Sequence, residues 1–392
     1  MARSSFAGLG LGFTLLACSA GKEAITSPLD GAAHDGTLTI DGDLPPSDAF
    51  DFDAPSDTFV DAKLDPDAAC AKSEVKASRP PVDVIVAVDT SGSMFEEAAN
   101  VQANINKMVD YLKASGVDYR VVMIAEPPNP LFPPGFGPPS ICVPPPLGGA
   151  ACASNPPGYR QVATTVASTD ALKVILDTYD STDAKKKWAD ALRPEAFKAF
   201  IVITDDNANV PTPTPVANTF DDEILKRGSG TFGTAAARKY IFYPICGASD
   251  ADSTKKCGTG MVNNGQAYVD LAKLTGGRTY ELCAASFAPA FTGIGKGLAA
   301  AVACEVLMPA PPPGEKLDPT KVNVTFTPTG GAPITIEQDA SKPCEAGANG
   351  WQYSADMKKI LICGDWCKKL KADPSSKLTI ALGCATKVKP PA

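Results

Sequence analysis

The sequence predicts a doubly wound α/β domain with a mostly parallel sheet and helices on both faces, followed by a small disulfide-bonded β domain. Between about residues 70 and 305, apolar β-branched runs alternate with helical patterns, which is typical of a parallel sheet. A proline-rich stretch at 306–314 then acts as a stiff linker. Short strand patterns and four cysteines follow it, in residues 315–392.

Six strands are predicted in the α/β domain. The first, Val82–Asp89, is a run of mostly β-branched apolar residues that ends in Asp89, with the length and composition of a strand buried on both faces. The other five strands are predicted at Tyr119–Ala125, Gln161–Ala167, Ala199–Thr204, Lys239–Ile245 and Arg278–Leu282.

Helical patterns follow most of these strands. Asp221 stands at the start of one of them as a predicted N-cap, and Gly276-Gly277 ends another. The predicted helices are Glu96–Ser115, Thr169–Tyr179, Ala184–Phe197, Asp221–Arg227, Gly265–Thr275 and Phe287–Glu305.

Residues 126–158 interrupt the alternation with a proline-rich loop. It holds twelve of the 36 prolines and leaves the carboxyl end of the second strand. A long loop beside a binding edge is often functional, and an insertion without a role is the alternative. We expect a disulfide between Cys142 and Cys152 within it.

The C-terminal segment, residues 315–392, reads as a small β module. Trp351, Tyr353 and Trp366 can supply its core, and its cysteines can act as staples. Cys363 and Cys367 form a C-x₃-C, which is neither the redox C-x-x-C nor a zinc pair, so structural disulfides are favoured. Strands are predicted at Val322–Thr327, Ile334–Gln338, Lys359–Cys363 and Leu378–Gly383.

The N-terminus carries the pattern of an export signal. Residues 1–18 have one basic residue, Arg3, and a short apolar run that ends in Leu15-Leu16-Ala17-Cys18. This ending resembles the lipobox of bacterial lipoproteins, which implies lipidation of Cys18 and, with Ser19 next, an outer-membrane or cell-surface location. An ordinary signal peptide on a periplasmic or secreted protein is the alternative.

Residues 19–69 are predicted to form a disordered acidic tether. Nine aspartates recur between Asp41 and Asp67 with few large apolar residues, so the segment cannot bury enough surface to offset the entropy of ordering. A calcium loop at Asp41-Gly42-Asp43 fits no complete pattern. The tether would hold the folded part away from the membrane.

Composition excludes several classes of function. The net charge is −8 and no basic stripe is present, which argues against nucleic-acid binding. The single histidine, His34, lies in the tether, so histidine-based catalysis and His-ligated zinc are excluded. Pro and Gly together make up nearly a fifth of the 392 residues, which indicates long loops.

Oxygen-bearing side chains follow two of the predicted strands. Asp89-Thr90-Ser91-Gly92-Ser93 comes after the first strand, and Thr204-Asp205-Asp206 follows Phe200–Ile203. Carboxyl ends of parallel strands meet at the edge where open α/β sheets bind ligands. Carboxylate and hydroxyl oxygens suit a hard divalent cation such as Mg²⁺.

These two segments resemble the metal-ion-dependent adhesion site of von Willebrand factor type A domains, which have a Rossmann-like fold. The resemblance covers about 225 residues and implies that Ser91 and Ser93 bind Mg²⁺, or Mn²⁺ or Ca²⁺, directly, with Asp89 acting through water. Asp205 is the matching carboxylate of the third loop. Asp206 stands where many members have Gly, so it is a possible auxiliary ligand.

The second loop of that family contributes a threonine just before a helix. Thr182 is the residue chosen here, with Ser168, Thr169 and Ser181 as alternatives, because the usual glycines are absent. By resemblance, one coordination position stays open for an acidic residue of a partner.

The resemblance implies a cell-surface protein that binds a protein or matrix ligand through a divalent cation, without catalysing a reaction. One alternative is an envelope-assembly or structural scaffold with a vestigial metal site. A less favoured alternative is a metal-dependent hydrolase that uses Asp205 and Asp206, which do not form the opposed pair that glycosidases need.

Twelve cysteines favour an oxidising compartment. Connectivity cannot be deduced from the sequence, so the pairing is a hypothesis drawn from position. Cys283 is left unpaired or competes with Cys257 for Cys246. The expected bridges are Cys70–Cys304, Cys142–Cys152, Cys246–Cys257 and two more among Cys344, Cys363, Cys367 and Cys384.

Overall fold

The computed structural model describes residues 73–131, 137–228, 230–254, 257–258, 263–311, 313–314 and 316–390. The predictions for the export signal, Cys18, the acidic tether and Cys70 lie outside the described residues. Within those ranges, no helix combines the length and the apolar character needed to cross a membrane.

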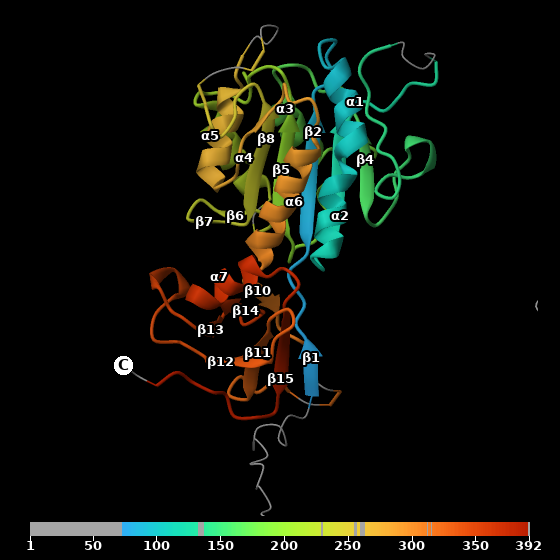
Figure 1. Ribbon diagram of the computed structural model, residues 1–392. Coiled ribbons are helices and arrows are strands. Elements are labelled where there is room, and N and C mark those ends of the chain that lie inside the picture. Colours follow the sequence, from blue (N-terminus) through green and yellow to red (C-terminus); the bar gives the residue numbers. More distant parts are fainter. Residues whose placement is uncertain are drawn as a thin grey trace, which may run out of the picture. The chain divides into compact units, whose positions relative to one another are not determined.

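Six parallel strands form the central sheet, in the order β4-β3-β2-β5-β8-β9 (Figure 1). The chain moves outward from β2 to β4, then returns to the other side of β2 for β5, so the strand order reverses between these two strands. Open α/β sheets bind ligands at such a reversal, outside the carboxyl ends of the strands. The strands are β2 (Val82–Val88), β3 (Tyr119–Ala125), β4 (Tyr159–Ala163), β5 (Phe197–Ile203), β8 (Tyr240–Cys246) and β9 (Tyr280–Glu281).

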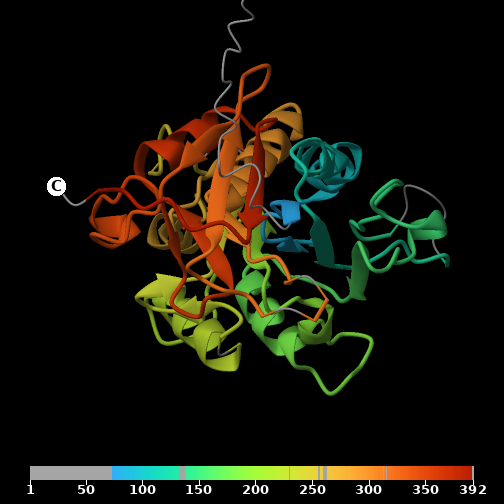
Figure 2. The same ribbon diagram turned by 90° about the horizontal axis from the view of Figure 1, so that it is seen from below.

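Helices cover both faces of this sheet (Figure 1; Figure 2). Alternate residues of β2 supply the two cores, with Val84 and Val86 on one face and Ile85 and Ala87 on the other. The mixed α/β class predicted from the sequence is therefore confirmed. One face carries α1 (Phe95–Asn104), α2 (Asn106–Ala114) and α6 (Ala288–Val302); the other carries α3 (Ala171–Tyr179), α4 (Val216–Arg227) and α5 (Gln266–Thr275).

The helix predicted at Ala184–Phe197 is wrong. Only a short 3₁₀ turn, Ala189–Ala191, forms there. Pro194 disfavours the helical conformation of the residue before it. The backbone N–H of Arg193 instead donates to Asp83 Oδ2 at 2.6 Å, which ties this segment to β2.

The N-cap role predicted for Asp221 is also wrong. Helix α4 already begins at Val216, which leaves Asp221 buried within it. Its carboxylate accepts hydrogen bonds from Arg238 Nε at 2.8 Å and Arg238 Nη2 at 2.7 Å, and also from the Tyr240 hydroxyl. Arg238 belongs to a small antiparallel pair, β6 (Gly233–Thr234) and β7 (Ala237–Arg238).

The remaining strands form two antiparallel sheets around one apolar core. Strand β1 (Ser73–Lys76) pairs with β15 (Lys377–Leu382), which also pairs with β11 (Val322–Thr327). The second sheet has the order β10-β14-β13. The other elements of this part are β10 (Glu305–Leu307), β12 (Ile334–Ile336), β13 (Trp351–Tyr353), β14 (Lys359–Ile362) and α7 (Gly364–Ala372), the last lying between the predicted strands.

The first described strand of the chain, β1, lies beside the last one, β15. Because β1 pairs with β15, and β10 with β14, the segment from β2 to α6 is inserted between two strands of the β module. The predicted boundaries at residues 70 and 305 therefore do not follow the strand pairing. Strand β10 also occupies the beginning of the predicted linker at 306–314.

The disulfides agree with the predicted pairing only in part. Cys142–Cys152 forms as expected, and Cys344–Cys363 lies within the β module. The predicted Cys70–Cys304 and Cys246–Cys257 pairs are wrong. The bridges formed instead are Cys257–Cys283 and Cys304–Cys367, and Cys384 is also disulfide-bonded.

Cys246 is the free thiol among the described cysteines. It ends β8 and packs against Ala248 and Val269, away from Cys257, which packs on the opposite core. Burial raises the pKa of this thiol to about 12, so it is an inert core residue.

The described part of the proline-rich loop packs against α1 and α2. Ile141, Val143 and Leu147 are buried in the core on that face of the sheet. Asn106 Nδ2 donates to the carbonyl of Pro144 at 3.2 Å. This part of the loop is a packed cover of the helices, which sequence composition alone did not indicate.

Candidate functional site

The first loop of the candidate site begins where β2 ends. Asp89 has a fully buried side chain, and its Oδ1 accepts the Ser91 N–H at 2.8 Å. Asp89 Oδ2 accepts the Thr204 hydroxyl at 2.8 Å. The hydroxyl oxygens of Ser91 and Ser93 lie 3.3 Å apart, within hydrogen-bond distance of each other and on the same loop as the buried Asp89 carboxylate.

The loop after β5 lies directly against the first one. The Asp89 N–H donates to the carbonyl of Ile203 at 2.9 Å, and Thr204 is fully buried. Asp206 Oδ1 accepts hydrogen bonds from the Asn207 N–H at 2.7 Å and from Asn263 Nδ2. The structure thus brings together both loops that the sequence predicted.

Asp205 and Asp206 differ in their contacts. Asp206 is bound to neighbouring nitrogens, whereas Asp205 is half-buried and has no hydrogen-bond or ion-pair partner among the described residues. Asp205, which the sequence comparison matched to the metal-binding carboxylate, is therefore the one of the two that is available to a ligand.

A third loop reaches the same edge, between β4 and α3. The Thr90 N–H donates to the carbonyl of Val166 at 2.9 Å, and Thr204 Oγ1 donates to the carbonyl of Ser168 at 3.4 Å. The Asn209 N–H donates to the carbonyl of Thr169 at 3.1 Å. Ser168 and Thr169 therefore lie beside the other two loops.

Thr182 and Ser181 lie elsewhere in the structure. They follow the carboxyl end of α3, whereas Ser168 and Thr169 precede its start. Arg160 Nη2, at the amino end of β4, donates to the carbonyl of Ala184 at 3.1 Å, which places this segment at the opposite edge of the sheet. The residue chosen for the second loop is not brought to the site, and two of its alternatives are.

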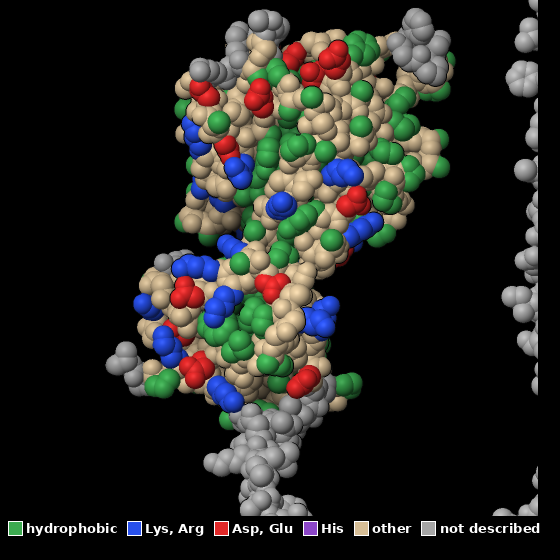
Figure 3. Space-filling model, in the orientation of Figure 1, with side chains coloured by type: hydrophobic (Ala, Val, Ile, Leu, Met, Phe, Trp, Pro, Cys, Tyr) green, Lys and Arg blue, Asp and Glu red, His purple; other side chains and the backbone are tan. Residues whose placement is uncertain are grey.

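The site is acidic. Burial raises the pKa of Asp89, and the Asp205 carboxylate adds to the rise, while hydrogen bonds from Ser91 and Thr204 oppose it. Burial also raises the pKa of Glu97 on α1, with contributions from Asp205, Glu96 and Asp89. Across the described ranges, no lysine or arginine pairs with Asp89, Asp205 or Glu97. Figure 3 shows acidic side chains gathered on this edge.

Sequence reasoning missed Tyr268, on α5. Its side chain is fully buried, and its hydroxyl has no hydrogen-bond partner in the described part of the chain. Burial raises its pKa well above the usual value, and the charges of Asp89, Asp170 and Asp206 add to this rise. A buried hydroxyl without a partner, in the field of three carboxylates, is costly unless something binds there. Nothing in the sequence separates this tyrosine from an ordinary core residue.

The donor set fits a hard divalent cation. Asp89, Ser91, Ser93 and Asp205 offer only oxygens, as Mg²⁺ and Ca²⁺ prefer, and the unpartnered Tyr268 hydroxyl is a further buried polar group in the field of Asp89. Phe95, the first residue of α1, is 51% exposed beside these loops. The site therefore combines uncompensated negative charge, converging hydroxyls and an exposed aromatic ring.

Comparison with known proteins identifies no family. No protein-family model and no curated protein matches the chain. The chain is similar to the crystal structure of the pilus adhesin SpaC from Lactobacillus rhamnosus GG in its open conformation, at 10% identity and a TM-score of 0.30. The similarity covers 79% of this chain and 40% of that one, so the chain spans less than half of the adhesin's length. Neither fold nor function is inferred from a similarity at this level.

Proposed function

We propose that this protein is a cell-surface binding protein whose α/β domain, similar to von Willebrand type A domains, holds a divalent cation and uses it to bind a partner. The main support for this proposal is that three loops meet where the strand order reverses, around a buried Asp89 and an unpartnered Asp205. The proposal assigns no catalysed reaction.

Ser91, Ser93 and Asp205 would hold the cation directly, Mg²⁺ being the first choice and Mn²⁺ or Ca²⁺ the alternatives. Asp89 would act from beneath, since both of its oxygens already accept hydrogen bonds from Ser91 and Thr204. Either Ser168 or Thr169 would take the place predicted for Thr182. When bound, the cation supplies positive charge for an acidic residue of a protein or matrix ligand.

The chain's own residues prepare the site for such a partner. The hydrogen bonds of Thr204 hold the loops after β2 and β5 together before any ligand arrives. Phe95 offers an exposed aromatic surface at the rim, the kind of side chain that contributes strongly to binding when a partner covers it.

Calorimetric titration of the full chain with Mg²⁺ and with Mn²⁺ tests this proposal. We expect binding near one equivalent, lost in Asp89→Ala and weakened about tenfold or more in Ser91→Ala, because each substitution removes an oxygen ligand or its support. Asp110→Ala is the matched control, since Asp110 is an exposed carboxylate on α2 outside the site. Circular dichroism checks that each variant is folded, and Ser91→Ala carries the test if Asp89→Ala is not.

A structural scaffold is the second candidate, and one observation favours it. The three loops are already joined by protein hydrogen bonds through Thr90, Asp89 and Thr204, so they close without a cation. In that case no heat of binding appears with either metal, and chelators leave the melting temperature unchanged. That result would exclude cation-dependent adhesion.

The surface location is a separate proposal, based on the lipobox-like end at Cys18. We expect the full chain to incorporate radiolabelled palmitate in a bacterial host and to fractionate with membranes. Cys18→Ser should abolish the label and release the protein in soluble form, because one anchor is removed. Unchanged labelling in Cys18→Ser, or a chain that is never labelled, would refute the anchor and leave periplasmic or secreted locations.

A further inference from the structure

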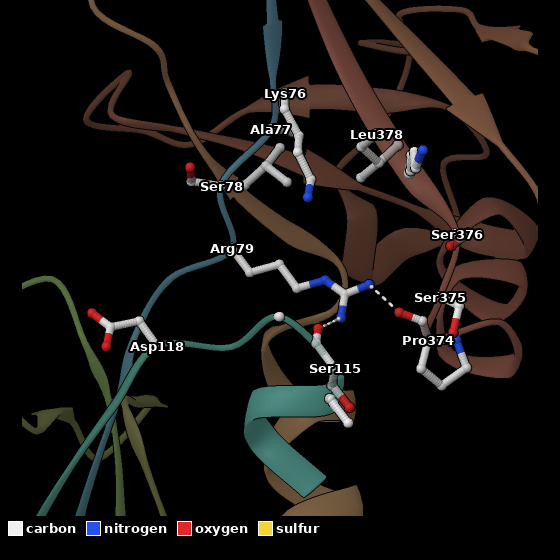
Figure 4. Close-up of a pocket in the computed structure, with 14 residues that line it drawn as sticks. Lys76, Ala77, Ser78, Arg79, Ser115, Asp118, Pro374, Ser375, Ser376 and Leu378 are labelled. Atoms are coloured by element: carbon white, nitrogen blue, oxygen red, sulfur yellow. Dashed lines mark hydrogen bonds between the residues drawn. The ribbon is translucent and has the colours of Figure 1, made fainter. Parts of the chain in front are cut away.

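A cavity of about 450 Å³ lies at the opposite end of β2 from the candidate cation site. Its walls come from the segment between β1 and β2, the end of α2 and the turn that precedes β15 (Figure 4). Val306 and Leu378 contribute apolar side chains to its lining, and four serines contribute hydroxyl groups. The polar lining residues are Lys76, Ser78, Arg79, Ser115, Asp118, Ser375, Ser376 and Lys377.

Arg79 spans this pocket with its guanidinium. Its Nη1 donates to the carbonyl of Ser115 at 3.0 Å and its Nη2 to the carbonyl of Pro374 at 3.5 Å, as Figure 4 shows. Both acceptors are neutral, and no carboxylate pairs with Arg79 among the described residues. A guanidinium has five N–H donors, so most of them remain for a ligand. Burial lowers the pKa of Arg79, which marks an incompletely compensated charge.

Two lysines add to this positive charge. Lys76 is opposite Thr379 in the β1–β15 pair, so Lys76 and Lys377 share one face of the ladder as diagonal neighbours. Both are exposed, and neither has an ion-pair partner in the ranges that the structure describes. In Figure 4 the Lys76 side chain points toward Arg79. Neighbouring like charges repel each other unless an anion lies between them.

The nearby acidic residues are engaged in other contacts. Asp118 pairs with Arg193, and its carboxylate points away from Arg79 in Figure 4. Asp373 accepts hydrogen bonds from the Thr329 N–H at 2.8 Å and the Thr329 hydroxyl at 2.7 Å. Among the described residues, neither carboxylate forms an ion pair with Lys76, Arg79 or Lys377.

We propose that this pocket binds an oxyanion, a phosphate or sulfate group, free or carried as an ester on a small molecule. Guanidinium and ammonium groups bind such anions through charge-assisted hydrogen bonds, and serine hydroxyls complete the shell. The volume falls within the range of small-molecule sites, so the anion can carry a sugar-sized group. The pocket precedes β2 and the cation site follows it, so the two sites lie at opposite ends of this strand.

Calorimetric titration of the full chain with inorganic phosphate, sulfate and glucose 6-phosphate tests the proposal. We expect one equivalent to bind, with affinity that falls as salt rises. Lys76→Gln and Lys377→Gln should each weaken binding about tenfold, because each removes one charge-assisted contact. Arg79→Gln should abolish binding. Lys186→Gln is the matched control, since Lys186 is an exposed lysine outside the pocket.

The two lysine variants keep the test decisive if Arg79→Gln fails to fold. Tighter binding of glucose 6-phosphate than of phosphate identifies an ester as the ligand, whereas equal affinities identify the free anion. No binding to the wild-type chain at millimolar anion, or equal binding to the lysine variants and the control, would overturn the proposal.

Discussion

Arg193→Met should lower the free energy of unfolding by about 3–5 kcal/mol, because it leaves the Asp83 carboxylate buried without its partner. Arg193 Nε lies 2.9 Å from Asp83 Oδ1, and Arg193 Nη2 lies 2.8 Å from it. The Asp83 side chain is only 1% exposed, so water cannot replace the lost guanidinium. Chemical denaturation monitored by circular dichroism measures the loss.

Arg160→Met is the matched control for this experiment. Its ion pair with Asp190 is solvent-exposed, with 59% of the aspartate side chain accessible, so we expect a loss of about 0–1 kcal/mol. Similar losses for the two variants would mean that Asp83 is solvated and that the buried pair contributes no more than a surface pair.

The loss in Arg193→Met should also depend on pH. Burial raises the pKa of Asp83, and Arg193 opposes this rise in the wild-type chain, so the substitution raises this pKa further. A carboxyl whose folded pKa lies above its unfolded value stabilises the fold at low pH and loses that contribution as pH rises through the folded pKa. The variant should therefore lose less stability at about pH 5 than at about pH 8. A pH-independent loss would contradict this account.

The central sheet was predictable because its central strands are largely apolar, with Asp83 the one charged residue of β2 and Lys198 that of β5. Val82–Val88 and Phe197–Ile203 are buried on both faces, so their composition identifies them without any knowledge of neighbours. The polar residues that end these strands are local signals too, and parallel packing brings them to one edge. Two of the three loops of the candidate site, around Asp89 and Asp205, were therefore accessible to sequence reasoning.

Strand and disulfide pairings between distant segments could not be predicted from the sequence. Strand β1 pairs with β15 across about 300 residues, and no local pattern at Ser73–Lys76 indicates this partner. The same holds for Cys304–Cys367 and Cys257–Cys283, because spacing does not determine which thiols meet in space.

Two of the local errors have a tertiary cause. The helical pattern at Ala184–Phe197 gives way because Asp83 binds the backbone and side chain of Arg193, and because Trp188 is fully buried beside β5. The second loop was assigned to Thr182 by its place between two predicted helices. The second of these helices does not form, and Ser168 and Thr169, which precede α3, lie beside the other two loops instead.

Phe200→Ala should lower the free energy of unfolding by about 3–5 kcal/mol, as expected for an aromatic ring removed from a packed core. Phe200 lies at the middle of β5, fully buried between the sheet and the helices of one face. Its ring centroid lies 5.4–6.4 Å from those of five other aromatic residues: Trp188, Phe220, Phe232, Tyr240 and Phe242. These neighbours are rigid rings on four different segments, two of them on β8, so they cannot collapse fully into the cavity.

Phe95→Ala is the matched control for Phe200→Ala, because it removes the same side chain from a site that is 51% exposed. We expect its effect on denaturation to stay within about 0.5 kcal/mol, as for most surface substitutions. Because Phe95 borders the candidate cation site, the same variant should bind Mg²⁺ normally while weakening partner binding. A large loss of stability in Phe95→Ala would mean that this ring packs as a core residue, and a small loss in Phe200→Ala would mean that the aromatic cluster repacks. The pair of variants thus separates the residues that hold the sheet together from those that the fold leaves exposed for recognition.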